Sequence, residues 1–129
     1  MWHIHDLHGA TGAHPAEQLG VIAFEKLPEI AAKNKRQLDA NRELLQDFLA
    51  KQHALEYFWP EQGTVIFPKL KGSADVSAFC SRLRNEFDVS VVPGSFFEDP
   101  SRIRIGVAGE TQAVEASLAQ LQRGLRALA

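Results

Sequence analysis

The order of helical and strand-like hydrophobic periods constrains the fold of this chain more than any other feature. Apolar residues recur at helical spacing in 15–26, 29–52, 76–87 and from about residue 110, and they alternate as in strands in 55–60, 64–70, 88–94 and 101–109. Helices and short strands in this order are typical of helices covering one side of a sheet. We therefore expect an α+β fold, with a mostly antiparallel sheet, helices packed on one face, and a long helical segment in front.

The length of the chain suits a single domain, at 129 residues. Residues 1–13 lack a regular period, so we expect an irregular N-terminal segment there and one small domain over 14–129. Pro28 removes a backbone donor and is expected to separate the first helix from the second. The buried stripe of the second helix is expected to consist of Ile30, Leu38, Leu45, Phe48 and Leu49.

Two further residues predict local features of this domain. Pro68 cannot donate to a strand ladder, so the far end of the strand over 64–70 is expected at a sheet edge. Ser73 precedes the helix over 76–87 and is a candidate for its N-cap.

Charge and composition exclude several classes of function. The formal net charge is -2, and no run of like charges is long enough for an interaction tail. No apolar run approaches the roughly 20 residues of a membrane span. Cys80 is the single cysteine, which rules out an intrachain disulfide and favours a reducing compartment. We expect a soluble cytoplasmic protein that binds neither nucleic acid nor membranes.

The alternation Arg102, Ile103, Arg104, Ile105 carries the clearest chemistry. Side chains on a strand point to opposite faces in turn, so isoleucines facing the core would place both arginines on the other face. Arginine binds a carboxylate through two parallel, charge-assisted hydrogen bonds. Taken on its own, however, the pattern favours the plainer interpretation of a solvated strand face with surface ion pairs.

A proline-glycine pair precedes this strand. Pro93 and Gly94 are typical of a tight turn in which the backbone approaches a ligand closely. Phe96 and Phe97 follow and are able to line a pocket. The alternative is a plain connection whose aromatic side chains cover the core.

Other reactive side chains give weaker signals. His3, His5 and His8, with Asp6, offer metal-ligand chemistry, but their spacing matches no zinc pattern, and we predict no metal site. Cys80 falls in the apolar stripe of the helix over 76–87 and is expected to be buried as a small hydrophobic residue. The chain contains no nucleophile elbow and no phosphate-binding loop.

The stretch VSVVPGSFFEDPSRIRIGVA at 89–108 resembles the end of class I and II aminotransferases of fold type I. Proteins of that family show a Pro-Gly-x-x-Phe turn, matched by Pro93, Gly94 and Phe97, and then an arginine strand, matched at Arg104. The long helical segment is similar to the connecting helix of the family, with its Asn-Arg pair at 41–42. The turn at Gly63 is similar to a hairpin of the family.

This resemblance implies a C-terminal small domain of a pyridoxal-phosphate-dependent aminotransferase. Arg104 would hold the α-carboxylate of the amino-acid or 2-oxo-acid substrate, and Gly63, Pro93, Gly94 and Phe97 would lie around it. The segment with the catalytic lysine of the family has no counterpart here. The resemblance therefore implies no catalytic residue, no cofactor bound by this chain alone, and a missing large domain as partner. Glu98 stands where the family often has glycine.

Two other interpretations remain open. The chain could be a free-standing module of the same fold that binds a small anion or a partner protein. An exposed apolar interface would favour the fragment over such a module, and would also allow self-association. The other open interpretation is a compact enzyme that uses Cys80 or the early histidines.

Overall fold

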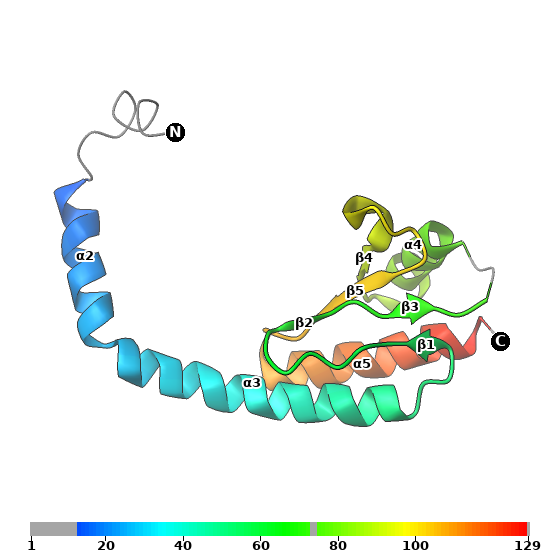
Figure 1. Ribbon diagram of the computed structural model, residues 1–129, viewed down its shortest axis with the longest axis horizontal. Helices are drawn as coiled ribbons and strands as arrows, with labels where there is room; N and C mark the ends of the chain where they lie inside the picture. The colour runs from blue at the N-terminus through cyan, green and yellow to red at the C-terminus, as the bar shows by residue number, and fades with distance from the viewer. Residues whose placement is uncertain (1–12, 73–74, 129) are drawn as a thin grey trace. The chain divides into compact units, whose positions relative to one another are not determined.

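The computed structural model describes residues 13–72 and 75–128 (Figure 1). By packing, the chain divides into one unit that ends at Lys35 and a second unit from Arg36 to Ala129. The elements in order are α2 (His14–Glu25), α3 (Leu27–Ala50), β1 (Leu55–Glu56), β2 (Val65–Ile66), β3 (Lys69–Leu70), α4 (Val76–Phe87), β4 (Val92–Pro93), the 3-10 turn η1 (Gly94–Phe97), β5 (Ile103–Gly106) and α5 (Thr111–Arg126). The expectation of one small domain over 14–129 stays a prediction.

The first unit contains α2 and the start of α3. Pro15 lies in the first turn of α2, where its missing N–H costs nothing. The predicted break at Pro28 is confirmed, because α2 ends at Glu25 and α3 begins at Leu27. None of the residues of α2 is buried. Ile30 is 43% exposed, so its predicted place in the buried stripe of α3 is wrong.

The sheet of the second unit is built from antiparallel pairs. β5 lies between β2 and β4, while β1 pairs with β3. Pro68 splits the predicted strand over 64–70 into β2 and β3, but it does not mark an edge. β3 pairs with β1 on one side and bridges Arg102 on the other, and the carbonyl of the buried Pro68 accepts the N–H of Ile103 at 3.0 Å.

The core of the second unit lies between the sheet and the helices. The side chains of Ile103 and Ile105 on β5 belong to the same buried cluster as residues of α3, α4 and α5. Figure 1 shows α5 alongside both α4 and the last turns of α3. The other face of β5 carries the exposed Arg104. The α+β prediction, with helices on one face of an antiparallel sheet, is thereby confirmed.

α4 starts and packs for identifiable reasons. Its N-cap is Asp75, whose carboxylate accepts the N–H groups of Ser77 and Ala78, so the candidate cap at Ser73 was wrong in position. Ser73 itself lies outside the described residues. A side-chain atom added at Gly124 of α5 would collide with Leu83 of α4, which is fully buried. A residue without a side chain therefore sets how closely these two helices approach.

One polar side chain is fully buried in the second unit. Asn41 of α3 donates from its Nδ2 to the carbonyl of Val107 at 2.9 Å and to that of Gly109 at 2.8 Å. Gln37, one turn earlier, donates to the same Gly109 carbonyl at 2.8 Å. These bonds attach α3 to the segment between β5 and α5. Asn41 was not expected in the buried stripe of α3, but it is one of the buried residues of this helix.

Within 13–72 and 75–128, no helix combines the length and the apolar character that a membrane crossing requires.

Candidate functional site

β5 presents the predicted arginine alternation. Ile103 and Ile105 are buried, while Arg104 between them is exposed on the opposite face. The face that carries Arg104 lies opposite the face on which the helices pack. The sequence prediction that the isoleucines face the core is confirmed.

Arg102 is held by the protein itself. Its Nε donates to the carboxylate of Asp99 at 2.8 Å, and its Nη1 donates to the carbonyl of Phe67 at 2.9 Å. The Asp99 carboxylate also accepts the hydroxyl of Ser101 at 2.6 Å. The hydrogen bond from Ser101, followed by that from Arg102, lowers the pKa of Asp99 below its usual value. The carboxylate therefore stays charged at neutral pH and keeps Arg102 engaged.

Arg104 has a different environment from Arg102. Its guanidinium carbon lies 5.7 Å from the centre of the Phe97 ring. Among residues 13–72 and 75–128, no carboxylate or carbonyl accepts a hydrogen bond from it. Arg104 is therefore a cation on an aromatic ring whose hydrogen-bond donors remain available to a ligand.

The turn before β5 depends on Gly94 for space. The Gly94 N–H donates to the Arg102 carbonyl at 2.7 Å, and its own carbonyl accepts the N–H of Asp99. A side-chain atom at Gly94 would lie 2.6 Å from the Arg102 carbonyl oxygen and would collide with that of Asp99. The close approach expected at this glycine is therefore to the backbone of the protein rather than to a ligand. Pro93 precedes the turn as its extended N-cap residue.

Glu98, at a position where the family often has glycine, has a left-handed backbone. Its φ is 62°, in the left-handed region where glycine has no steric cost. The residue ends η1, so the backbone keeps the conformation that glycine favours while the side chain is a glutamate.

Gly63 lies at another part of the fold. It also has a left-handed backbone, with φ 105°. Arg42 of α3 donates to the carbonyls of Gly63, Pro60 and Glu61, at 2.9, 2.6 and 3.2 Å. The guanidinium carbon of Arg42 also lies 4.7 Å from the centre of the Trp59 ring. The Asn-Arg pair of α3 thus holds two loops, Asn41 at 107–109 and Arg42 at 60–63.

The predicted site residues form one group with one outlier. Pro93, Gly94, Phe97 and Arg104 come together where β4, η1 and β5 meet. Val65 pairs with Gly106, so Gly63 lies about four residues along the sheet from the position opposite Arg104, or roughly 13 Å.

Sequence reasoning did not identify two direct neighbours of Arg104. Val92 pairs with Arg104 across β4. Phe67 occupies the equivalent position on the other side when the register from Val65 to Gly106 is continued. Both neighbours follow from the strand register. The register cannot be read from the sequence until it is known which strands pair.

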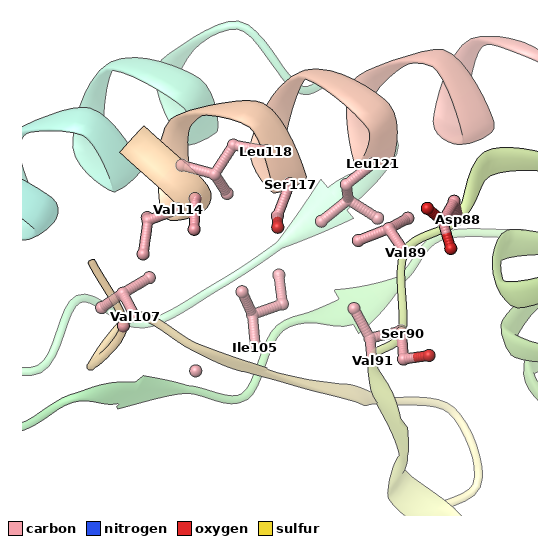
Figure 2. A pocket seen from close by; sticks show the side chains of 13 residues that line it. Asp88, Val89, Ser90, Val91, Ile105, Val107, Val114, Ser117, Leu118 and Leu121 are labelled. Carbon is pink, nitrogen blue, oxygen red and sulfur yellow. The ribbon is translucent and has the colours of Figure 1, made fainter. Parts of the chain in front are cut away.

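A hollow of about 270 Å³ lies on the other face of the sheet. It is bordered by apolar side chains of β5, of α5 and of the segment before β4, among them Ile105, Val107, Val114 and Leu121 (Figure 2). It contains none of the predicted site residues. Ile105 points toward this hollow while Arg104, its neighbour, points away from it. We therefore assign the hollow to the packing of α5 on the sheet rather than to the candidate site.

Of the remaining candidate residues, the structure describes Cys80 but not the early histidines. Cys80 is buried, and this burial raises the pKa of its thiol against the opposing effect of Arg84. Its expected role as a small core residue is confirmed. His3, His5, His8 and Asp6 lie outside the described residues. Among the residues that are described, no cluster of histidine, cysteine and acidic side chains could hold a metal ion.

Comparisons with known proteins match most of this chain. The family model "Aminotransferase class I and II" matches residues 19–121. Capreomycidine synthase of Streptomyces vinaceus is 28% identical over 110 residues, which are 84% of this chain and 28% of the synthase. Aspartate aminotransferase of Bacillus sp. (strain YM-2) is 27% identical over 125 residues, which are 90% of this chain and 31% of that enzyme.

A solved structure shows the same fold. The PLP-dependent aminotransferase from Streptococcus suis 89-1591 superposes with a TM-score of 0.90 at 24% identity, over 97% of this chain and 33% of that one. The chain therefore spans about a third of the length of the proteins that it matches.

Proposed function

The chain belongs to the class I and II aminotransferases, and on that basis we propose that it is the C-terminal small domain of a pyridoxal-phosphate-dependent enzyme of amino-acid metabolism. In this proposal Arg104 holds the α-carboxylate of an amino-acid or 2-oxo-acid substrate. The rest of the enzyme supplies the cofactor site. The names of the relatives include both a synthase and an aminotransferase, so the reaction type within the family stays open.

The contrast between two neighbouring arginines carries this proposal. Arg102, directly before β5, and Arg104 on β5 lie on one face, but only Arg102 is neutralised, by Asp99. An exposed arginine that packs on an aromatic ring, with its donors unused, suits a planar carboxylate. The Phe97 ring limits the directions that the guanidinium can adopt and so lowers the ordering cost of binding.

The residues present do not fit the cofactor. Pyridoxal phosphate, when bound, supplies an electron sink and is attached to a lysine. All six lysines of this chain are exposed. Lys51 borders a hollow of about 260 Å³, but Asp47 and Glu115 border it too, and their charges would repel a phosphate group. We therefore assign no step of the chemistry to this chain beyond carboxylate binding.

The first unit supports a fragment over a free-standing module. Six large apolar side chains between residues 19 and 30 are between 43% and 77% exposed, namely Leu19, Val21, Ile22, Phe24, Leu27 and Ile30. An apolar surface this dense on consecutive helical turns is typical of an interface. We propose that the missing large domain covers it, and that self-association replaces that contact when the domain is absent. The single cysteine, buried and reduced, agrees with a cytoplasmic location.

The carboxylate role is testable on this chain. Titration with acetate should shift the NMR signals of the backbone N–H groups of β5, with a Kd on the order of tens of millimolar, because one ion pair scarcely exceeds the cost of association. The variant Arg104→Gln should abolish the saturable response. Arg36→Gln is the matched control, since Arg36 is also exposed and lies on a helix away from this strand. A response that Arg36→Gln removes and Arg104→Gln leaves would remove Arg104 from the site.

The dependence on a missing domain has its own test. After incubation with pyridoxal phosphate and reduction with borohydride, we expect scattered, substoichiometric labelling of several lysines, because each of them is solvent-exposed. Peptide mapping by mass spectrometry measures this. Stoichiometric labelling of a single lysine would show that the short chain builds its own cofactor pocket, contrary to the proposal.

A further inference from the structure

We infer that the Arg104 site selects carboxylates that carry an apolar, aromatic side group. This inference rests on the proposed carboxylate role of Arg104 and adds the substrate class to it. The observation behind it is that the guanidinium of Arg104 lies in a row of apolar side chains on the open face of the sheet. We call Phe67, Val92, Phe97 and Arg104 the Arg104 patch.

The strand register places the first two members of the patch. Val92 on β4 pairs directly with Arg104, and directly opposite residues of antiparallel strands share a face. On the other side of β5, the pairs Val65 with Gly106 and Ile66 with Ile105 put Phe67 opposite Arg104 when they are continued by one residue. Both neighbours of Arg104 across the sheet are therefore apolar. Val92 remains 37% exposed, so part of this surface is available to a ligand.

Phe97 completes the patch above the strand. Its ring stands edge-on to that of Phe67, with the ring centres 5.7 Å apart, and it is 48% exposed. The Arg104 guanidinium lies at the same distance of 5.7 Å from its centre. A carboxylate bound to Arg104 would thus have exposed aromatic surface beside it. A phenyl group on that ligand would be able to pack against this surface and lose contact with water.

Acidic substrates are less well suited to this surface. A second carboxylate needs a second cation, and Arg102 is already bound to Asp99. Lys69 lies on the same face but bridges Arg102 rather than Arg104, so it is a diagonal neighbour at best. A dicarboxylate would have to extend past the Phe67 ring to reach Lys69. The direct neighbours of Arg104 therefore favour an apolar side group over a charged one.

A ligand series on the 129-residue chain tests this inference. Acetate, phenylacetate and succinate are titrated at pH 7 while the NMR signals of the β5 backbone N–H groups are followed. We expect phenylacetate to bind about tenfold tighter than acetate, because its ring adds apolar contact to the same ion pair. Succinate should bind no more than about twofold tighter than acetate, as expected for two equivalent carboxylates without a second cation.

Two neighbouring aromatic residues offer a matched pair of variants. Phe97→Ala should reduce the advantage of phenylacetate over acetate to about twofold or less, while Phe96→Ala should leave it unchanged, although Phe96 is more exposed at 77%. Phe97→Leu serves in place of Phe97→Ala if the latter does not fold. Phe97→Leu should remove the part of the preference for phenylacetate over acetate that requires an aromatic ring at this position.

The outcomes separate this inference from the proposed function. Equal affinities for acetate and phenylacetate, both lost in Arg104→Gln, would overturn the apolar preference and leave the carboxylate role in place. No response at Arg104 to any of the ligands would overturn both. Succinate binding tighter than phenylacetate, with the excess lost in Lys69→Ala, would replace the apolar substrate class by an acidic one.

Discussion

Replacing Gly94 by alanine is expected to lower the free energy of unfolding by about 3 kcal/mol, because the added carbon has no room. The atoms that it would meet are the backbone carbonyl oxygen of Asp99, with which it would collide, and that of Arg102, at 2.6 Å. Carbonyls in a hydrogen-bonded turn cannot rotate away as a flexible side chain can. Relief of the clash would break the bond from the Gly94 N–H to Arg102. Urea denaturation followed by circular dichroism measures the loss.

Gly106→Ala is the matched control for Gly94→Ala. Gly106 lies on β5, where an added carbon meets nothing within 4 Å and the backbone needs no positive φ. We expect its stability to change by less than about 0.5 kcal/mol. Equal losses in the two variants would mean that the glycines act through chain flexibility, and the steric explanation for Gly94 would be wrong.

Replacing Asn41 by alanine is expected to lower the free energy of unfolding by about 2 to 3 kcal/mol. Asn41 is fully buried and donates to the carbonyls of Val107 and Gly109. Its removal leaves the Val107 carbonyl without this bond in a site that water does not reach. It also leaves a small cavity beside α3. Asn41→Asp should be at least as damaging near neutral pH, since a buried carboxylate would face two carbonyl oxygens.

Gln37→Ala is the matched control for Asn41. The two side chains share the Gly109 carbonyl as acceptor, but the bond of Gln37 is exposed to water. We therefore expect its loss to cost about 0.5 kcal/mol. If both variants lose the same stability, burial does not determine the strength of this contact.

These two residues also link the fold to the candidate site. The turn at Gly94 carries Phe97 and leads to the Asp99–Arg102 pair, so it fixes the surroundings of Arg104 from one side. Asn41 holds the chain immediately after β5. A carboxylate-binding arginine on a short strand depends on such supports, because loops alone hold a guanidinium less accurately.

Much of the fold was predictable from local pattern. The last helix and α4 have apolar stripes at helical spacing, and the buried residues Phe79, Leu83, Leu118 and Leu121 lie on them as expected. The alternation around Arg104 predicted which face of β5 is buried. The strands were overestimated in length, because Pro68 separates β2 from β3 and because β4 covers only Val92–Pro93 at the end of the expected strand over 88–94.

The amino-acid sequence alone was enough to identify the helices and the buried face of β5, since both follow from spacing along one segment, while Arg104 became the candidate through the resemblance to the aminotransferases. The spacing by itself did not distinguish Arg104 from Arg102. That distinction depends on Asp99 and on the Phe67 carbonyl, 35 residues away in the chain. The burial of Asn41 and the exposure of Ile30 likewise depend on what packs against each turn of α3. Strand register and long-range packing decide such contacts, and local periodicity does not contain them.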